Sequence, residues 1–355
     1  MSITPPFALT SQDAKEYDLL IVDGSYLIHR ILYASASKGD PPFSEMYTSN
    51  GEPSGAVYGC LKTLRAAINT ADFLAKDLMV VWDGRPPQLS SRRVALYPGY
   101  KQHDPPKDPK EAQESARHRI LLEEQRPVLC NLLSLLGVPS VNLPRREGDD
   151  VVAWAVGMLS DRRRILIMSD DRDYYQLVSD HVHVYRASIK VPIVVGPHNF
   201  EQAVGVVSPS HYLLSAAISG DGSDHITGIP GVGDGTANKI ANNTVINGCI
   251  SYAAVEEAVL KCLDMDNRNR RYYNLVLPSL STVTRNLELM DLRLENSTLE
   301  ERGAIWAEYS RLRGVREQEV AREFDRLEFK SYLEDFAGWV QPFKRLQLFP
   351  NETAA

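Results

Sequence analysis

Residues 165–178, ILIMSDDRDYYQLV, begin with four apolar residues and continue with three aspartates within four positions. A short apolar run bounded by polar residues predicts a buried β-strand. Aspartate is a poor strand former, and carboxylates a few ångströms apart repel one another. The acids are therefore expected to follow the strand, and their crowding requires a stabilising partner.

The same pattern recurs upstream. DLLIVDGS (18–25) and DLMVVWDG (77–84) are apolar runs that end in Asp-Gly, and VPSVNLP (138–144) is a further candidate strand. Helical patterns lie between these strands, over residues 55–70, 111–136 and 149–160. Apolar strands that alternate with helices predict an α/β fold, with a mostly parallel central sheet and helices on both faces.

Ligands of such sheets bind outside the carboxyl ends of the strands, where Asp23, Asp83 and Asp171 are expected to lie. REGDDVVAWAV (146–156) adds acids at a helix start, and SGDGSDHITGIPG (219–231) adds two more. The candidate metal-ligating set is Asp23, Asp83, Glu147, Asp149, Asp150, Asp171, Asp173, Asp221 and Asp224. Asp170 is expected to point away, because Asp171 and Asp173 alternate onto one face.

Each acidic cluster alone has an ordinary explanation, as a helix cap or an Asp-Gly turn. Their convergence at one sheet edge, however, would be very unfavourable without cations. Hard divalent ions prefer oxygen ligands, with magnesium as the first candidate, and two such ions can activate water and stabilise the leaving oxygen of a phosphodiester. Leaving these nine carboxylates out changes the net charge from −7 to +2, so the charge does not exclude a nucleic-acid partner.

The composition predicts a soluble globular protein, since 43% of the 355 residues are hydrophobic and 24% are charged. There is no run of 18 apolar residues and no basic-then-apolar leader, so we expect a cytoplasmic protein without membrane contact. The four cysteines are scattered and match neither a zinc site nor a disulfide framework. The eight histidines form no constellation, and His181 and His183 are expected on a strand face.

Seven motifs, in this order, resemble those of the 5′-nuclease family. This family contains bacteriophage 5′–3′ exonucleases, flap endonucleases and the N-terminal nuclease domain of bacterial DNA polymerase I. The motifs are VDGSYLIHR, SNGEPSGAVYGCL, VVWDG, ALYPGYK, EGDDVVA, SDDRDYYQLV and GDGSDHITGIPGVGDGTA, within residues 18–240. RNLELMDL (285–292) is similar to a further family stretch.

The resemblance implies a PIN-like nuclease core over residues 17–205, after a loose tail over 1–16. A helical arch over 85–119, a helix–three-turn–helix domain over 206–300 and a helical extension over 301–355 complete the expected organisation. It also implies two Mg²⁺ ions, for which Mn²⁺ can substitute. One ion would lie among Asp23, Asp83, Glu147 and Asp149, and the other among Asp150, Asp171, Asp173, Asp221 and Asp224.

The arch carries eight Lys or Arg against four Asp or Glu. Arg92, Arg93 and Lys101 fit phosphate contacts, and Tyr100 fits stacking on a displaced base. By resemblance Lys101 and Arg30 assist the reacting phosphate. Asp104 stands where many members have arginine, which weakens the expected grip of the arch.

The turn at 228–235 resembles the family's duplex-binding motif, with Gly228, Gly231, Gly233 and Thr236 as backbone or side-chain contacts to phosphate and K⁺ as a candidate ion. Gly235 replaces a lysine common in the motif, which predicts a looser hold on duplex.

These features predict a monomeric, structure-specific 5′ nuclease of replication or repair that leaves a 5′-phosphate. Its expected partners are DNA ends, flaps and nicks, with RNA–DNA hybrid as a further candidate, in a bacterial host if the chain is phage-encoded. The alternatives are a haloacid-dehalogenase-like phosphatase and a non-catalytic structure-specific DNA-binding protein. Ser25 stands where the phosphatase would need its second aspartate, and LLSAAIS (213–219) reads as helix.

Overall fold

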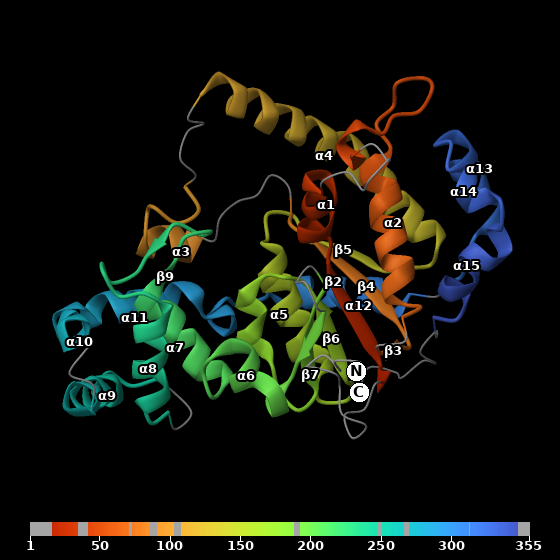
Figure 1. Cartoon of the computed structure of the whole chain (residues 1–355). Coiled ribbons are helices and arrows are strands. Elements are labelled where there is room, and N and C mark those ends of the chain that lie inside the picture. Colours follow the sequence, from red (N-terminus) through yellow and green to blue (C-terminus); the bar gives the residue numbers. More distant parts are fainter. Residues whose placement is uncertain are drawn as a thin grey trace, which may run out of the picture.

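The computed structural model describes residues 16–34, 42–70, 73–84, 91–102, 108–187, 192–246, 250–265, 270–311 and 313–346. A six-stranded sheet in the order β5-β4-β2-β6-β7-β8 forms its centre (Figure 1). The strands are β2 (Leu19–Asp23), β4 (Leu78–Trp82), β5 (Ser140–Asn142), β6 (Ile165–Met168), β7 (Val182–Arg186) and β8 (Ile193–Val195). Neighbours pair in parallel except for β7 and β8. The predicted mostly parallel sheet is confirmed, and all four predicted strands belong to it.

Helices cover both faces of this sheet. Alternate residues of β2 belong to different apolar clusters: Leu20 and Val22 pack with helices α1 and α2, whereas Leu19 and Ile21 pack with α5. The bounds of the covering helices are α1 (Gly24–Tyr33), α2 (Gly55–Ala67), α4 (Pro109–Leu135) and α5 (Gly148–Leu159). Burying each large aliphatic side chain contributes about 1.5–3 kcal/mol, so the two clusters fix the sheet between its helical layers.

Glycine is required immediately after two of the strands. A Cβ at Gly24 would lie 2.6 Å from Val80 Cγ1, and one at Gly84 would lie 2.0 Å from the carbonyl oxygen of Leu143. Both contacts are closer than atoms can approach. The Asp-Gly pairs therefore let the chain turn sharply at the carboxyl ends of β2 and β4, which leaves Asp23 and Asp83 at the sheet edge.

The described part of the predicted arch consists of α3 (Ser91–Leu96), a turn up to residue 102 and the exposed first turns of α4. Figure 1 shows α4 extending past the sheet toward the side where α3 lies. Its C-terminal half is buried against α2, where the Gln125 side-chain oxygen accepts a hydrogen bond from the backbone N–H of Ala56 (2.7 Å). One helix thus joins the core to the exposed part of the arch region.

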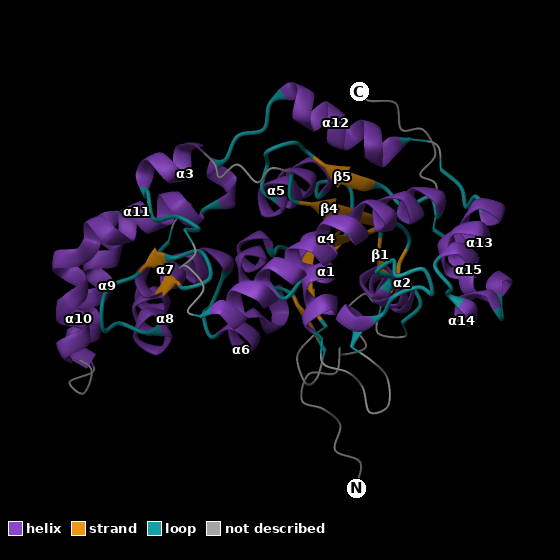
Figure 2. Ribbon diagram, turned by 90° about the horizontal axis from the view of Figure 1, so that it is seen from above, coloured by secondary structure: helices purple, strands orange, loops and turns teal. Residues whose placement is uncertain are grey.

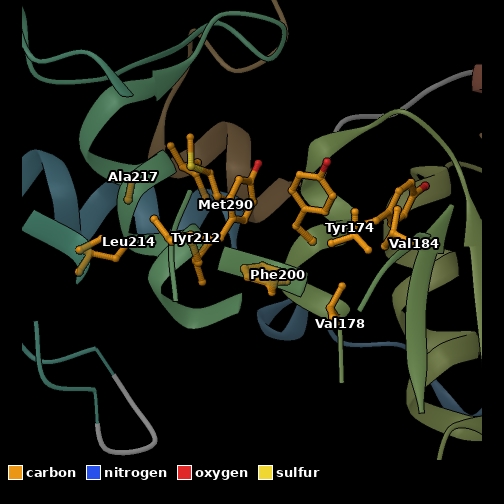
Figure 3. Close-up of a cluster of buried hydrophobic side chains, with 14 of the residues drawn as sticks. Tyr174, Val178, Val184, Phe200, Tyr212, Leu214, Ala217 and Met290 are labelled. Atoms are coloured by element: carbon orange, nitrogen blue, oxygen red, sulfur yellow. The ribbon is translucent and has the colours of Figure 1, made fainter. Parts of the chain in front are cut away.

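A second group of helices lies beside the sheet. It contains α6 (Phe200–Val204), α7 (Pro209–Ser219), α8 (Asp234–Asn243), α9 (Tyr252–Met265), α10 (Arg270–Val276) and α11 (Leu280–Met290). Strands β9 (Gly220–Asp221) and β10 (Ile226–Thr227) form a hairpin before α8. Tyr174, Phe200, Tyr212 and Met290 belong to one cluster that continues from the sheet into these helices (Figure 3). The boundary predicted at residues 205–206 therefore crosses a continuous apolar core.

The predicted C-terminal extension is helical in the described residues and packs on the core. Its elements are α12 (Leu299–Ser310), α13 (Glu317–Arg326), α14 (Lys330–Leu333) and α15 (Phe336–Lys344). Figure 2 shows α12 beside β5, with α13–α15 near α2. The rings of Tyr58 and Tyr332 stack with centroids 4.5 Å apart, and Arg65 Nε donates to the carbonyl oxygen of Trp339 (3.0 Å).

Two short parallel strands, β1 (Glu16–Tyr17) and β3 (Leu74–Ala75), form a separate pair. Strands β2, β4 and β5 are shorter than the segments 18–25, 77–84 and 138–144 in which they were predicted. Among the residues that the structure describes, every helix is too short or too polar to cross a membrane.

Candidate active site

Asp23 and Asp83, at the ends of β2 and β4, hold the starts of two helices. Asp23 Oδ1 accepts a hydrogen bond from the Tyr26 N–H (2.9 Å), and its Oδ2 accepts one from the Tyr174 hydroxyl (3.1 Å). Asp83 Oδ1 accepts from the Gly148 N–H (2.7 Å), the first residue of α5. These N–H groups orient both carboxylates at the sheet edge. Tyr174 was not predicted as a site residue, although it directly follows Asp173 in the sequence.

The segment after β6 turns into the 3₁₀-helix η2 (Arg172–Leu177), with Asp171 as its N-cap. Asp171 Oδ1 accepts from the Asp173 N–H (2.9 Å), and the Asp171 N–H donates to Ser169 Oγ (3.1 Å). Asp170 instead lies beside the Tyr26 hydroxyl, which donates to it, and Arg186 (3.6 Å). Asp170 therefore has its own partners, as expected from its alternation with Asp171.

The β9–β10 hairpin supplies the next pair of acids. Asp221 Oδ1 accepts from the N–H groups of Ser223 (2.7 Å) and Asp224 (3.4 Å). The Asp224 carbonyl oxygen accepts from the Lys101 N–H (2.9 Å), and its carboxylate lies 3.5 Å from Lys101 Nζ. Lys101 thus ties the turn after α3 to this hairpin.

At the start of α5, Glu147 and Asp150 meet a group of buried polar side chains. Glu147 Oε2 accepts from Lys101 Nζ (2.6 Å) and from the Tyr100 hydroxyl (2.8 Å). Arg93 donates to Glu147 Oε1 (3.2 Å) and to Asp150 Oδ1 (2.7 Å). Asp149 lies between these two carboxylates in the first turn of α5, where the helix dipole favours negative charge.

The pKa values show that these side chains share one electrostatic environment. Burial and the charges of Asp83 and Asp171 raise the pKa of Asp23 to about 7, although the Tyr26 N–H opposes the shift. Burial, Asp171, Asp224, Asp221 and Asp149 raise the pKa of Asp173 well above its ordinary value. Carboxylates from all five sequence segments therefore interact in one region.

The pKa of Glu147 shifts in the opposite direction, downward. Burial would raise the pKa of its carboxyl, but Lys101 and Arg93 outweigh burial and lower it to about 2. Burial also raises the pKa of Asp224 to about 7, against the opposing charge of Lys101. The site is thus short of positive charge except near Lys101 and Arg93.

The donor set fits a divalent ion in its chemistry, because it consists of mutually repelling carboxylates, of which Asp23, Glu147 and Asp150 are buried. In the described part of the chain, no three or more His, Cys, Asp or Glu side chains are arranged to hold an ion as they stand. Lys101 and Arg93 occupy positions between the acids and supply the nearest positive charges.

Two predicted DNA contacts do not fit the structure. Arg93 and Tyr100 are each only 1% exposed, and their polar atoms are engaged with Glu147. The prediction that Arg93 binds a phosphate and Tyr100 stacks on a base is therefore wrong for this arrangement. A basic sequence suggested an exposed arch, but tertiary partners bury this part of it.

The other predicted contacts lie at or near the surface. Arg92 is partly exposed and donates to Glu295 Oε2 (3.0 Å), and Arg30 is partly buried in the last turn of α1. In the Gly-rich turn, Gly231 has φ +84°, which favours glycine, and Gly233 caps α8. The remaining residues of this predicted set, Gly228 and Thr236, are partly buried at the two ends of the turn. All of these phosphate contacts stay predictions.

Two histidines, His181 and His183, were expected on a strand face. His183 is buried on β7, where its Nδ1 lies 2.7 Å from the Tyr17 hydroxyl, as expected for a strand-face residue. His181 precedes β7 and is exposed, so only half of that prediction is confirmed.

A mostly parallel sheet with acids at its carboxyl edge, helices beside it and a Gly-rich turn before α8 defines the 5′-nuclease class of α/β protein. A family model for the 5′-3′ exonuclease N-terminal resolvase-like domain matches residues 18–205. The chain belongs to this family.

The relatives by sequence include a 5′-3′ exonuclease and a DNA polymerase I. The chain is 32% identical over 232 residues to a 5′-3′ exonuclease of Aquifex aeolicus, a match that covers 62% of the chain and 68% of the relative. It is 28% identical over 333 residues to the thermostable DNA polymerase I of Thermus aquaticus, covering 94% of the chain but 34% of that polymerase. The chain thus spans about a third of the polymerase's length.

Solved structures share the fold. The T5 D15 protein co-crystallised with metal ions superimposes with a TM-score of 0.57 at 18% identity, covering 91% of this chain and all of that one. The catalytic core of Rad2 in complex with DNA substrate gives 0.54 at 12% identity, covering 92% and 93%. The chain therefore shares its fold with the T5 D15 protein and the Rad2 catalytic core.

Proposed function

We propose that the protein is a divalent-metal-dependent, structure-specific 5′ nuclease that hydrolyses DNA phosphodiesters at 5′ ends or flaps and leaves a 5′-phosphate. The observation that carries this proposal is that carboxylates from five segments interact in one region, where Lys101 contacts Glu147 and Asp224. Membership of the 5′–3′ exonuclease family and the relatives' names support the substrate class. Magnesium is the first candidate ion, manganese a substitute and K⁺ a candidate at the Gly-rich turn.

Each group of residues at the site would have a role that follows from its position. When bound, divalent ions supply an activated water and stabilise the leaving oxygen. Asp23, Asp83, Asp149 and the acids of η2 and the β9–β10 hairpin present oxygens to that space. Lys101 extends among them and would hold the scissile phosphate, with Arg30 as a second contact at the end of α1. The Gly-rich turn would hold duplex by its backbone without reading sequence.

The test is cleavage of a 5′-labelled flap duplex with and without MgCl₂, together with the Asp171→Asn variant. We expect magnesium-dependent release of a 5′ product that the variant fails to produce, and product length distinguishes exonuclease from flap cleavage. Parallel assays on nicked DNA and an RNA–DNA hybrid define the substrate range, and sizing of the protein–DNA complex tests the proposed monomer. Binding of these substrates without cleavage of any of them would favour a DNA-binding protein. The absence of both binding and cleavage would favour the phosphatase.

A further inference from the structure

Arg93 joins three parts of the molecule that are distant in sequence. It lies in α3, its Nε donates to the Leu289 carbonyl oxygen in α11 (3.0 Å), and its terminal nitrogens donate to Glu147 and Asp150 in α5. The side chain is almost completely buried. A guanidinium group suits this position, because its rigid fork can satisfy a carbonyl oxygen and two carboxylates at once.

The bonds of Arg93 determine how the two carboxylates lie. Arg93 Nη2 donates to Asp150 Oδ1 (2.7 Å) and Nη1 to Asp150 Oδ2 (3.2 Å), so both Asp150 oxygens are engaged. Both Glu147 oxygens are engaged as well, by Arg93 on one side and by Tyr100 and Lys101 on the other. Oxygens held by charged donors are poorly available as direct ion ligands, and residues that orient ligands typically form such a layer.

We propose that Arg93 is a positioning residue of the metal site: it fixes Glu147 and Asp150, and through them the first turn of α5 that carries Asp149. This assignment rests on the proposed function and changes the expected role of Asp150 from direct ligand to partner of Arg93. Without Arg93, the three neighbouring carboxylates of α5 would repel one another, and Asp150 would be a buried charge without its counter-ion.

The structure offers a matched control elsewhere. The Arg313 side chain is only 6% exposed, and it donates from Nη1 (3.1 Å) and Nη2 (2.9 Å) to the two oxygens of buried Asp77 and to the Tyr309 carbonyl oxygen (2.9 Å). Arg313 lies between the C-terminal helices and the core, away from the carboxylate site. Its replacement by lysine therefore reproduces the structural cost of losing a buried, forked ion pair without touching the site.

The experiment compares Arg93→Lys and Arg313→Lys with the unmodified full chain. The first readout is the MgCl₂ concentration that gives half of the maximal thermal stabilisation, which needs no catalysis. The second is the separation of kcat from KM on a flap duplex. We expect Arg93→Lys to raise the magnesium midpoint by about 10- to 100-fold and to lower kcat with little change in KM, while Arg313→Lys lowers Tm only.

A double variant, Arg93→Gln with Asp150→Asn, removes both charges of the pair. It leaves no buried unpaired charge, so the test does not depend on the folding of either single variant. Its DNA affinity is measured across salt concentrations in EDTA. We expect an unchanged slope of log K against log salt, because a positioning residue neutralises no phosphate. A slope smaller by about 0.9 would overturn the proposal in favour of a phosphate contact, as each such contact contributes about that much.

Equal magnesium midpoints for Arg93→Lys and Arg313→Lys would also overturn it, since the role would then be structural alone. The proposed function can fail separately. If the unmodified chain cleaves no flap, the magnesium midpoint and the salt slope still decide the role of Arg93.

Discussion

At the scale of single residues, the acids at the sheet edge and the buried Arg93 depend on partners from several elements. Asp23 and Asp83 could be predicted, because Asp-Gly after an apolar run marks a strand end at the ligand-binding edge. Arg93 and Tyr100 could not be placed, since a basic segment is usually solvated, whereas here partners such as the Leu289 carbonyl oxygen and the acids at the start of α5 make burial favourable. Burial of a charged side chain depends on partners that are distant in the sequence.

Lys101 is the residue whose replacement should affect catalysis most directly. Its φ of +50° is unusual for lysine, and its ammonium contacts Glu147 and Asp224 in the middle of the acids. We expect Lys101→Met to reduce kcat by about 10²–10³-fold, the cost of removing one preorganised electrostatic group. Single-turnover cleavage of a flap duplex measures this rate, and duplex affinity measured in parallel should change far less. A loss of affinity equal to the loss of rate would contradict the assignment.

Gly84 offers a stability test at the same scale. A Cβ there would lie 2.0 Å from the Leu143 oxygen and 2.5 Å from the Arg145 nitrogen, both backbone atoms that cannot rotate away. We expect Gly84→Ala to lower the free energy of unfolding by about 1–3 kcal/mol or more. Gly157 is exposed in the last turn of α5 and has open space around it, so Gly157→Ala should instead stabilise by about 0.5–1 kcal/mol. Urea unfolding of both variants checks the contrast, and a similar loss for both would argue against the steric explanation.

At the scale of elements, the pattern of apolar residues predicted four strands of the central sheet and three of the helices that pack on it. Strands β2, β4 and β6 are fully buried runs, and the predicted helical segments 55–70, 111–136 and 149–160 correspond to α2, α4 and α5. The antiparallel pairing of β8 with β7 could not be predicted, because a three-residue strand carries too little pattern to reveal its direction. The two-residue strands β1 and β3 are shorter still.

The contact between α1 and α4 predicts a dependence of stability on pH. His118 of α4 stacks on Tyr33 of α1, with centroids 4.0 Å apart, and its Nε2 lies 3.0 Å from His29 Nδ1. Burial and the neighbouring His29 lower the pKa of His118 to about 4. At pH values between about 6.5 and about 4, the unfolded chain binds a proton at His118 that the folded chain does not yet bind. The free energy of unfolding therefore falls as the pH falls through this window.

We therefore expect the free energy of unfolding to decrease less between pH 7 and pH 4.5 in His118→Gln than in the unmodified protein. Urea unfolding at both pH values measures the difference, with exposed His181→Gln as the control. Parallel pH dependences in all three proteins would show that the His118 pair does not contribute.

At the scale of the whole molecule, one apolar cluster runs from the sheet into α7 and α11, and the acids of the hairpin before α8 meet those of the sheet. The positions of the acids in the sequence predicted that the two parts share one carboxylate site. Their shared core could not be predicted, because it depends on side chains such as Tyr212 and Met290 whose partners are far apart in the chain.

Removal of divalent ions should accordingly destabilise the entire fold. Because repelling carboxylates come from both the sheet and the helical part, we expect Mg²⁺ to raise the Tm relative to protein in EDTA, with a stabilisation of about 2.7 kcal/mol at 100 times the Kd. Calorimetry with NaCl of matched ionic strength is the control. An equal rise in NaCl would indicate general screening and would contradict an ion-binding site.

The C-terminal helices also constrain how the protein can be made. Arg326 pairs with Glu52, and the ring of Tyr332 covers Tyr58 on α2, so one side of a helix near the beginning of the chain is completed by residues near its end. A nascent chain emerges N-terminus first, and this side of α2 therefore stays exposed on the ribosome until α13 and α14 have been synthesised. Ribosome-bound chains arrested before α13 would thus present an apolar patch to chaperones.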